Sequence, residues 1–281
     1  MQTTRRQFVT SALGCALGTT LSRRLCLAAS RAKAIPIGCQ LYAVRGEFSR
    51  NVPETLETLA QMGYKGVEFW GYGGTPNVYQ QYSAAQLRKL LDENGLKCCG
   101  MHLELKALAD DCLKRTIENN QTLGNQYLTV AAAREKMSSE EAIGELAALL
   151  NQAAAQVRPH KMIVGYHAHP FDFARIGGRF AWEILFSRTQ PEVNMQMDIG
   201  NCLAGKGDPI AMLKQFPGRA RTIHLREYQD KTFESDYFKE VFRLCETTAG
   251  TQWYIVEMGG ADGNGFEVPR QALEKLHRVG K

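Results

Sequence analysis

Four residues of metal-binding type recur at near-regular intervals in the second half of the chain. His167, Asp198, His224 and Glu257 are separated by 31, 26 and 33 residues. Each interval is close to the length of one strand-plus-helix repeat, so the four side chains would come from consecutive repeats. A lone histidine in an apolar run is usually a core residue, but four ligand-type residues in register are hard to obtain by chance. Because imidazole and carboxylate suit Mn, Co, Zn, Fe and Mg, the spacing predicts a site for one divalent metal ion.

A divalent ion beside a sugar carbonyl would favour one kind of reaction. Chelation of the carbonyl oxygen and the neighbouring hydroxyl stabilises the enediolate that forms when the adjacent carbon loses its proton. If His167 is a neutral ligand, the catalytic base is Glu257, His169, Glu68 or His102, and we rank Glu257 first. For Glu68 and His102, support of the ligands or contact with a sugar hydroxyl is an equally good interpretation.

Aromatic side chains that follow the apolar runs are suited to stacking on the apolar face of a sugar ring. They are Tyr42, Phe69, Trp70, Tyr72, Phe171 and Phe173. About half of these would be ordinary packing, and we take Tyr42, Trp70 and Phe171 as the candidates for substrate binding. Arg226 follows the third ligand-type residue closely and could reach a substrate oxygen.

An architecture is needed that brings the ends of distant strands together. From residue 35 onward, eight short apolar runs alternate with eight amphipathic helical stretches, which is typical of buried parallel strands connected by helices. The apolar runs span 36–42, 66–70, 97–103, 127–131, 162–167, 193–198, 221–225 and 253–257. Eight such units over residues 35–281 predict a single-domain (β/α)₈ TIM barrel, whose active site lies at the carboxyl ends of the strands. A dinucleotide-binding fold is disfavoured because the glycines at 71, 73 and 74 lack the G-x-G-x-x-G spacing.

The positive charge of the chain is concentrated at its start. The formal net charge is +5, and residues 1–34 hold six basic residues and no acid, which leaves about −1 for the remainder. This balance disfavours a nucleic-acid partner. Asp262 and Glu267, near a glycine-rich segment at 259–265, would repel a phosphate group. We therefore expect an unphosphorylated carbohydrate as the partner.

Residues 1–34 have the organisation of an export leader. The sequence TRRQFV at 4–9 looks like a twin-arginine motif, a weakly apolar run follows at 8–21, and AKA at 32–34 is a suitable cleavage site. The apolar run is shorter than the ~20 residues that a membrane span needs. The sequence thus predicts a twin-arginine signal peptide, a periplasmic or otherwise exported mature protein, and no permanent membrane span.

Taken in order, the motifs of the mature chain resemble the sugar phosphate isomerase/epimerase family, the xylose isomerase-like barrels related to endonuclease IV. The matching pieces are QLYAVR (40–45), GYKGVEF (63–69), GLK (95–97), YHAH (166–169), MDIGN (197–201), TIHLREY (222–228) and WYIVE (253–257). The resemblance implies a metal held at the ends of strands five to eight, where Asp198, His224 and Glu257 match. Strand five departs from the pattern, because better-studied epimerases have a glutamate where this sequence has His167.

The sequence leaves several functions open. The leading hypothesis is a metal-dependent isomerase or epimerase acting on a non-phosphorylated sugar. The altered fifth strand gives weight to a lyase or hydratase acting on 3-keto-sugars or 3-keto-glycosides, in which the same enolate expels a group. A non-catalytic sugar-binding barrel is the alternative from another class, and a nuclease is least favoured on charge. Whether the chain forms a homo-oligomer is also left open.

Overall fold

The computed structural model describes residues 34–260 and 265–281 of the chain. The expected signal peptide therefore lies outside the described residues, except for its last residue, Ala34. The acidic residue at 262 also lies outside them. Within the described ranges, no helix is both long enough and apolar enough to cross a membrane. The residues from Ala34 onward form one compact unit.

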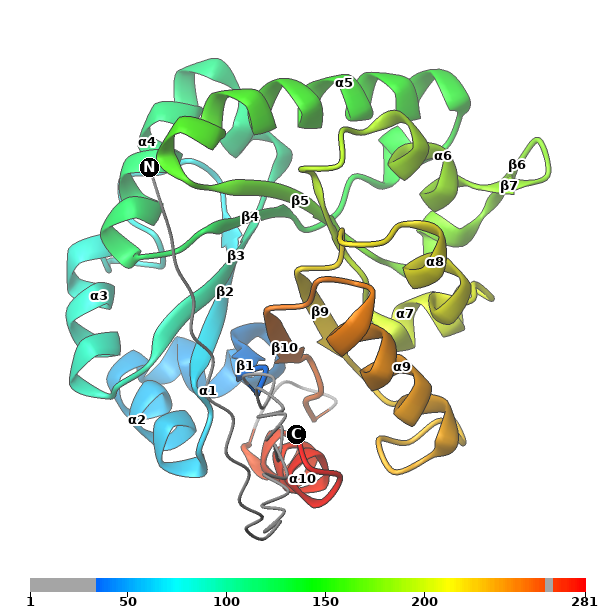
Figure 1. Ribbon diagram of the computed structural model, residues 1–281. Helices are drawn as coiled ribbons and strands as arrows, with labels where there is room; N and C mark the ends of the chain where they lie inside the picture. Colours follow the sequence, from blue (N-terminus) through cyan, green and yellow to red (C-terminus); the bar gives the residue numbers. More distant parts are fainter. Residues whose placement is uncertain (1–33, 261–264) are drawn as a thin grey trace, which may run out of the picture. The chain divides into compact units, whose positions relative to one another are not determined.

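In the described part of the chain, eight parallel strands form a nearly closed barrel (Figure 1). Their order in the sheet is β8-β5-β4-β3-β2-β1-β10-β9, so each strand lies beside the next strand of the barrel along the chain. Every strand overlaps one of the apolar runs recognised in the sequence, which confirms the TIM barrel prediction. The strands are β1 (Ile37–Gln40), β2 (Gly66–Tyr72), β3 (Lys97–Leu103), β4 (Tyr127–Val130), β5 (Ile163–His167), β8 (Asn194–Gln196), β9 (Thr222–Leu225) and β10 (Trp253–Val256).

The barrel closes between β8 and β9 with little regular pairing. An isolated parallel bridge joins Asp198 to His224, and the His224 amide donates to the Met197 carbonyl oxygen at 2.8 Å. Below this bridge, the Asn194 side chain donates to the Thr222 hydroxyl at 2.9 Å. Two of the predicted metal ligands therefore lie on the seam that closes the barrel.

Helices cover the outside of the barrel (Figure 1). Start and stop signals in the sequence account for their bounds. Asn51 caps α2 by accepting from the Glu54 amide, and Gly63, with φ of 111°, ends that helix in the left-handed region. The helices are α1 (Arg45–Arg50), α2 (Val52–Met62), α3 (Ala84–Glu93), α4 (Asp110–Leu123), α5 (Glu140–Val157), α6 (Ala181–Arg188), α7 (Ile199–Ala204), α8 (Pro209–Gln215), α9 (Asp236–Thr247) and α10 (Glu267–Arg278).

Short elements occupy several of the loops. A hairpin of β6 (Arg175–Ile176) and β7 (Arg179–Phe180) precedes α6. Short 3₁₀ helices follow several barrel strands, including η1 (Leu41–Val44) after β1 and η5 (Pro170–Phe173) beyond β5. These loops at the carboxyl ends of the strands carry the side chains that surround the candidate site.

The barrel strands bury polar as well as apolar side chains. The apolar residues pack with the helices in one hydrophobic core. The buried polar set comes from the strands near their carboxyl ends and includes Gln40, Glu68, His102, His167, Gln196 and His224, none more than 5% exposed. Buried polar groups are costly unless they are hydrogen-bonded, so this layer must form a connected network.

Candidate metal centre

The structure brings the four predicted metal ligands together at the carboxyl end of the barrel. His167 ends β5, His224 lies in β9, and Glu257 directly follows β10. Asp198 follows β8 and caps α7, its Oδ1 accepting from the Asn201 amide at 2.7 Å. One ligand atom from each of the four lies within 4.8 Å of the others. Such convergence is what a mononuclear divalent cation needs.

Each of the two imidazoles directs one ring nitrogen toward Glu257 and the other toward a supporting group. His224 Nδ1 lies 3.1 Å from Glu257 Oε2, and its Nε2 lies 2.6 Å from Glu68 Oε2. His167 Nε2 lies 3.7 Å from Glu257 Oε2, and its Nδ1 lies 3.1 Å from Gln196 Oε1. Metal-binding histidines are typically held in this way by a carboxylate or carbonyl on the far nitrogen. The geometry leaves His224 Nδ1 and His167 Nε2 as the ring nitrogens placed to bind a metal ion.

Glu68 lies at the centre of the supporting network. Its carboxylate accepts from Gln40 Nε2 at 2.7 Å and from Gln196 Nε2 at 2.8 Å, in addition to its contact with His224. His102 Nε2 lies 3.2 Å from Glu68 Oε2 and 2.7 Å from Gln196 Oε1. Glu68 and His102 are thus buried and contact the residues that hold the candidate ligands, a position that fits the support of the ligands, one of the two interpretations that the sequence allowed.

The sequence reading missed Gln40 and Gln196. A signal for each was present: Gln196 precedes Asp198 by two residues, and alternate residues of a strand face the same side. Gln40 is the last residue of β1, so it is also a polar residue at a strand end. An amide is not a base, and its oxygen is not a preferred ligand of the metals that suit imidazole, so the residue type alone does not mark either position.

A glycine makes room for the Glu68 side chain. Gly100 lies opposite Glu68 in the register between β2 and β3. A Cβ atom at position 100 would lie 2.1 Å from Glu68 Oε1 and 2.9 Å from its Cγ, which is far inside contact distance. Glycine is therefore the residue that allows this carboxylate to cross the barrel toward His224.

The charges of the site favour a cation. Burial opposes a raised pKa for His224, but the Glu68 and Glu257 carboxylates more than offset it and raise the pKa to about 10. Without a metal ion the His224 ring is therefore protonated at neutral pH, and an ion that binds its Nδ1 would displace that proton. Although burial acts in the other direction, the bond to His224 holds the pKa of Glu257 well below its ordinary value. Burial raises the pKa of Asp198 to about 6. Burial and the neighbouring imidazoles hold the pKa of His167 well below its usual range, so His167 is neutral, as a ligand must be.

The residues present fit a divalent metal ion. The Oδ2 atom of Asp198 is buried and accepts no hydrogen bond of good geometry within the described part of the chain, although the Arg226 guanidinium lies 3.3 Å away. A metal ion would give this oxygen a direct partner. Two carboxylates would balance the 2+ charge, and two imidazoles complete a donor set suited to Mn, Fe, Co or Zn.

Arg226 lies beside two of the ligand residues. Its Nε atom is 3.3 Å from Asp198 Oδ2, and its Nη2 atom is 3.1 Å from Glu257 Oε2. The side chain is 38% exposed, so the guanidinium lies between the carboxylates and solvent. The sequence suggested contact with a substrate oxygen, and the structure adds that Arg226 pairs with the ligand carboxylates.

The remaining candidates lie around the cluster. His169 lies just beyond β5, with its ring 4.9 Å from that of His167 and stacked on Phe171 at 5.2 Å. Its Nδ1 atom is buried and has no hydrogen-bond partner among the described residues, and burial lowers its pKa to about 4. Tyr42 and Trp70 contact each other at the ends of β1 and β2.

A nearly closed ring of eight parallel strands, with ligand-type side chains at the ends of four of them, defines a (β/α)₈ barrel with a candidate metal centre. Residues 56–278 match the family described as xylose isomerase-like TIM barrel, and the chain belongs to this family. No curated protein matches the chain.

Solved structures share the fold at low sequence identity. A sugar phosphate isomerase/epimerase from Parabacteroides distasonis has a TM-score of 0.74 and 21% identity, over 90% of this chain and 96% of that chain. An AP endonuclease of family 2 from Brucella melitensis has a TM-score of 0.61 and 16% identity, over 82% and 96%. The IOLI protein with a bound zinc atom has a TM-score of 0.55 and 16% identity, over 87% and 96%. At these identities the likeness shows the fold alone.

Proposed function

We propose that the chain is a divalent-metal-dependent sugar isomerase or epimerase that acts through an enediolate. The observation that carries the proposal is the convergence of His167, Asp198, His224 and Glu257 within 4.8 Å at the carboxyl end of the barrel. Membership of the xylose isomerase-like family and the likeness to a sugar phosphate isomerase/epimerase support the reaction class.

The charge at the mouth favours a sugar without a phosphate group. Arg226, the guanidinium beside the ligands, is paired with Asp198 and Glu257. Glu68 adds a third carboxylate, which is fully buried behind them. With a divalent ion bound, its charge and that of Arg226 would be balanced by the three carboxylates, so no positive charge would remain to bind a phosphate dianion, whereas a neutral sugar needs none.

The protein residues have separate parts in the proposed reaction. A bound divalent ion would supply Lewis-acid polarisation of the sugar carbonyl oxygen. Gln196 and Glu68 hold the His167 and His224 rings so that one nitrogen of each faces the ion. The Glu257 carboxylate is ionised, takes the proton from the carbon beside the carbonyl and, in an isomerisation, delivers it to the former carbonyl carbon. His169, which is neutral and has an Nδ1 without a hydrogen-bond partner among the described residues, accepts the proton of the neighbouring hydroxyl and passes it to the former carbonyl oxygen.

A lyase or hydratase on 3-keto-sugars or 3-keto-glycosides is the second candidate. The observation that favours it is the neutral imidazole of His167 at the end of β5, fixed by Gln196. Proton exchange from two sides needs a base on each side of the sugar, whereas elimination needs one base and a leaving group. Glu257 alone could serve elimination.

Metal content of the full chain tests the site. We expect about one divalent ion per chain in the parent, loss of the ion in Asp198→Ala, and retention in the control Asp92→Ala, whose carboxylate is exposed and pairs with Arg88. A parent that binds no metal, or an Asp198→Ala variant that binds it normally, rejects the proposal.

Solvent deuterium incorporation then separates the candidate activities. We would incubate the metal-loaded parent and Asp92→Ala with a panel of aldoses, ketoses and 3-keto-glycosides in D₂O. Deuterium in a recovered sugar supports the isomerase or epimerase. Release of the aglycone from a 3-keto-glycoside supports the lyase. Sugar binding with neither outcome indicates a non-catalytic sugar-binding barrel.

Export through the twin-arginine route is part of the same proposal. It is supported by the TRRQFV sequence at residues 4–9 and by the concentration of basic charge before residue 35. Replacing both Arg5 and Arg6 with lysine is expected to keep the protein in the cytoplasmic fraction of a host that has this route. Unchanged export of that double variant would contradict it.

A further inference from the structure

Four aromatic rings gather at the carboxyl ends of β1 and β2. Tyr42 meets Trp70 edge-on, with ring centroids 5.8 Å apart. Trp70 also contacts Tyr79 at 5.0 Å and Phe48 at 5.7 Å. Phe48 is fully buried and forms the floor. We call Tyr42, Trp70 and Tyr79 the aromatic shelf.

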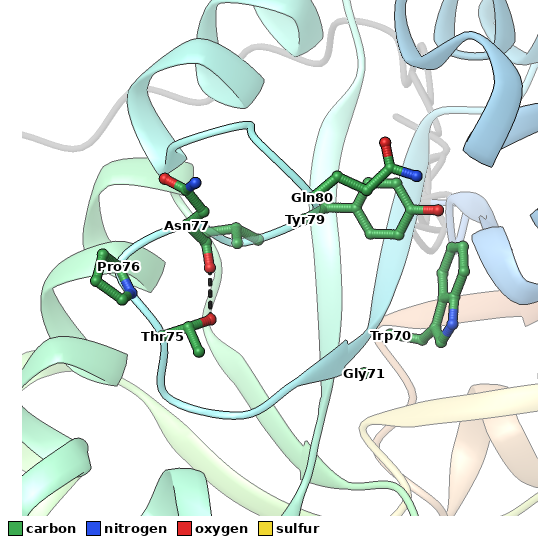
Figure 2. A pocket seen from close by; sticks show the side chains of 8 residues that line it. Trp70, Gly71, Thr75, Pro76, Asn77, Tyr79 and Gln80 are labelled. Atoms are coloured by element: carbon green, nitrogen blue, oxygen red, sulfur yellow. Dashed lines mark hydrogen bonds between the residues drawn. The ribbon is translucent and has the colours of Figure 1, made fainter.

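The aromatic shelf is partly open to solvent: Trp70 and Tyr79 are half-buried, and the Arg45 guanidinium lies over one face of the Tyr42 ring, 4.5 Å from its centroid. Tyr42 is 46% exposed. Among the described residues, no other large hydrophobic side chain is exposed to this degree. Trp70 and Tyr79 line a cavity of about 510 Å³ together with Gly71 and residues 75–80 (Figure 2). Cavities of several hundred Å³ are of the size that holds small organic ligands. Exposed aromatic area beside such a cavity points to a ligand with a flat apolar face.

The lining of this cavity selects against charge. Its side chains are aromatic, amide, hydroxyl or aliphatic, and none of them carries a charge at neutral pH. Asn77 and Gln80 are exposed at its edge and offer amide groups to a ligand. A phosphate or carboxylate would find no counter-charge among these lining residues, whereas a sugar ring or an aryl ring would find both stacking surface and hydrogen-bonding groups.

The aromatic shelf is tied to the metal centre through the backbone of Tyr42. The Tyr42 amide donates to Gln40 Oε1 at 3.1 Å, and Gln40 Nε2 donates to Glu68 Oε2 at 2.7 Å. Gln40 and Glu68 are register partners, and Tyr42 and Trp70 each come two residues later. Tyr42 lies in the 3₁₀ helix η1, whereas Trp70 lies in β2, where two residues advance the extended chain by about 6.6 Å. Trp70 thus lies about one sugar ring beyond Glu68, the residue that holds His224.

The loop that carries Tyr79 is held in place before any ligand arrives. The Asn119 side chain donates to the carbonyl oxygens of Thr75 and Pro76 at 3.2 and 3.3 Å and to the Tyr72 hydroxyl at 2.9 Å. The Tyr72 hydroxyl donates to the Thr75 carbonyl oxygen at 3.0 Å. A preformed surface binds with little loss of conformational entropy.

We propose that the aromatic shelf is a second ring-binding subsite. It holds the neutral ring that is linked to the sugar at the metal centre, so the substrate is an uncharged glycoside of at least two rings rather than a free monosaccharide. This inference rests on the proposed function, because it places the first ring at the metal centre.

Ligand affinity of the full chain tests the subsite without turnover. Isothermal titration with glucose, cellobiose and 4-nitrophenyl β-D-glucopyranoside would be run on the parent, Tyr42→Ala, Trp70→Leu and the control Trp253→Leu. Trp253 begins β10 at the opposite end of the barrel. We expect both two-ring ligands to bind the parent about fivefold or more tighter than glucose, as one aromatic stacking contact allows. Each shelf variant should lose most of that preference with unchanged glucose affinity, while Trp253→Leu keeps it. Thermal melts confirm that each variant is folded.

The outcomes separate the two proposals. Equal affinity of the parent for one- and two-ring ligands, or a preference that survives both shelf variants, overturns the subsite. Repeating the titrations after dialysis against EDTA measures, in the absence of metal, how much more tightly the protein binds two-ring ligands than glucose. A preference that persists there in a protein that never binds metal would refute the proposed function and leave the shelf as a binding surface.

Discussion

Replacing Gly100 with alanine tests the packing that orients the candidate metal centre. The new Cβ would lie 2.1 Å from Glu68 Oε1, 2.8 Å from its Cδ and 2.9 Å from its Cγ. Three atoms along the side chain are overlapped, so a small rotation at its tip does not relieve the contact. Glu68 is fully buried, and its displacement breaks bonds to Gln40, Gln196 and His224.

The magnitude follows from those broken contacts. Removing one partner from a buried ionic network costs about 3–5 kcal/mol. In a domain of this size each kcal/mol lowers the melting temperature by about 2–4 °C, so we expect Gly100→Ala to melt about 6–20 °C below the parent. Misplacing Glu68 also releases the His224 ring, which should weaken metal binding about 10- to 100-fold.

A second glycine gives the matched control. Gly144 lies within α5, and an added Cβ would meet the end of the flexible Arg188 side chain at 3.3 Å. Because alanine is the better helix former, Gly144→Ala should be neutral or stabilising by about 0.5–1 kcal/mol. Calorimetric melts and metal titrations of the two variants provide the comparison. If Gly100→Ala melts and binds metal like the parent, the account of Glu68 is wrong.

Four further predictions use other parts of the structure. Burial raises the pKa of Asp172 from 3.8 to about 7, so its contribution to stability is present below about pH 4 and is lost as pH rises to 7. In urea titrations, the unfolding free energy of Asp172→Asn relative to that of the parent should therefore rise by up to about 4 kcal/mol between about pH 4 and pH 7. A difference between the two proteins that does not change with pH would contradict the raised pKa. Glu257→Gln should lower deuterium exchange about 100-fold or more without unfolding the chain, and exchange at the parental rate would exclude Glu257 as the base. Arg219 is buried and donates to the carbonyl oxygens of Phe186, Gln190 and Val193, so Arg219→Lys should lower the unfolding free energy by about 2–3 kcal/mol in urea titrations. Chelation with EDTA should lower the melting temperature of the parent but not of Asp198→Ala, and equal shifts in both would argue against a metal held by Asp198.

The fold could be read from the sequence because its signals are local. Each apolar run and each cap, such as Asn51 before α2, acts over a few residues. Eight strand-and-helix units are enough to indicate a barrel, since parallel strands with short connections have few other ways to bury both faces. The convergence of Asp198, His224 and Glu257 follows from the same reasoning, because parallel strands place their carboxyl ends on one face.

The supporting network could not be read in this way. Glu68 and His224 are 156 residues apart in the chain, and Gln196 reaches Glu68 across 128 residues. Which side chains meet inside a barrel depends on strand stagger and on how the seam between β8 and β9 closes, and neither has a local sequence signature. The same is true of Arg226, whose pairing with two carboxylates depends on side-chain direction.

The sequence by itself therefore determined the eight-unit barrel and the face on which ligand-type residues gather, because strand period and chain direction are properties of short segments. Only the tertiary structure decided which nitrogen of His224 faces Glu257, where Gln40 and Gln196 act, and why position 100 must be glycine. Those features are contacts between side chains from distant strands, and their distances exist only once the ring of strands has closed.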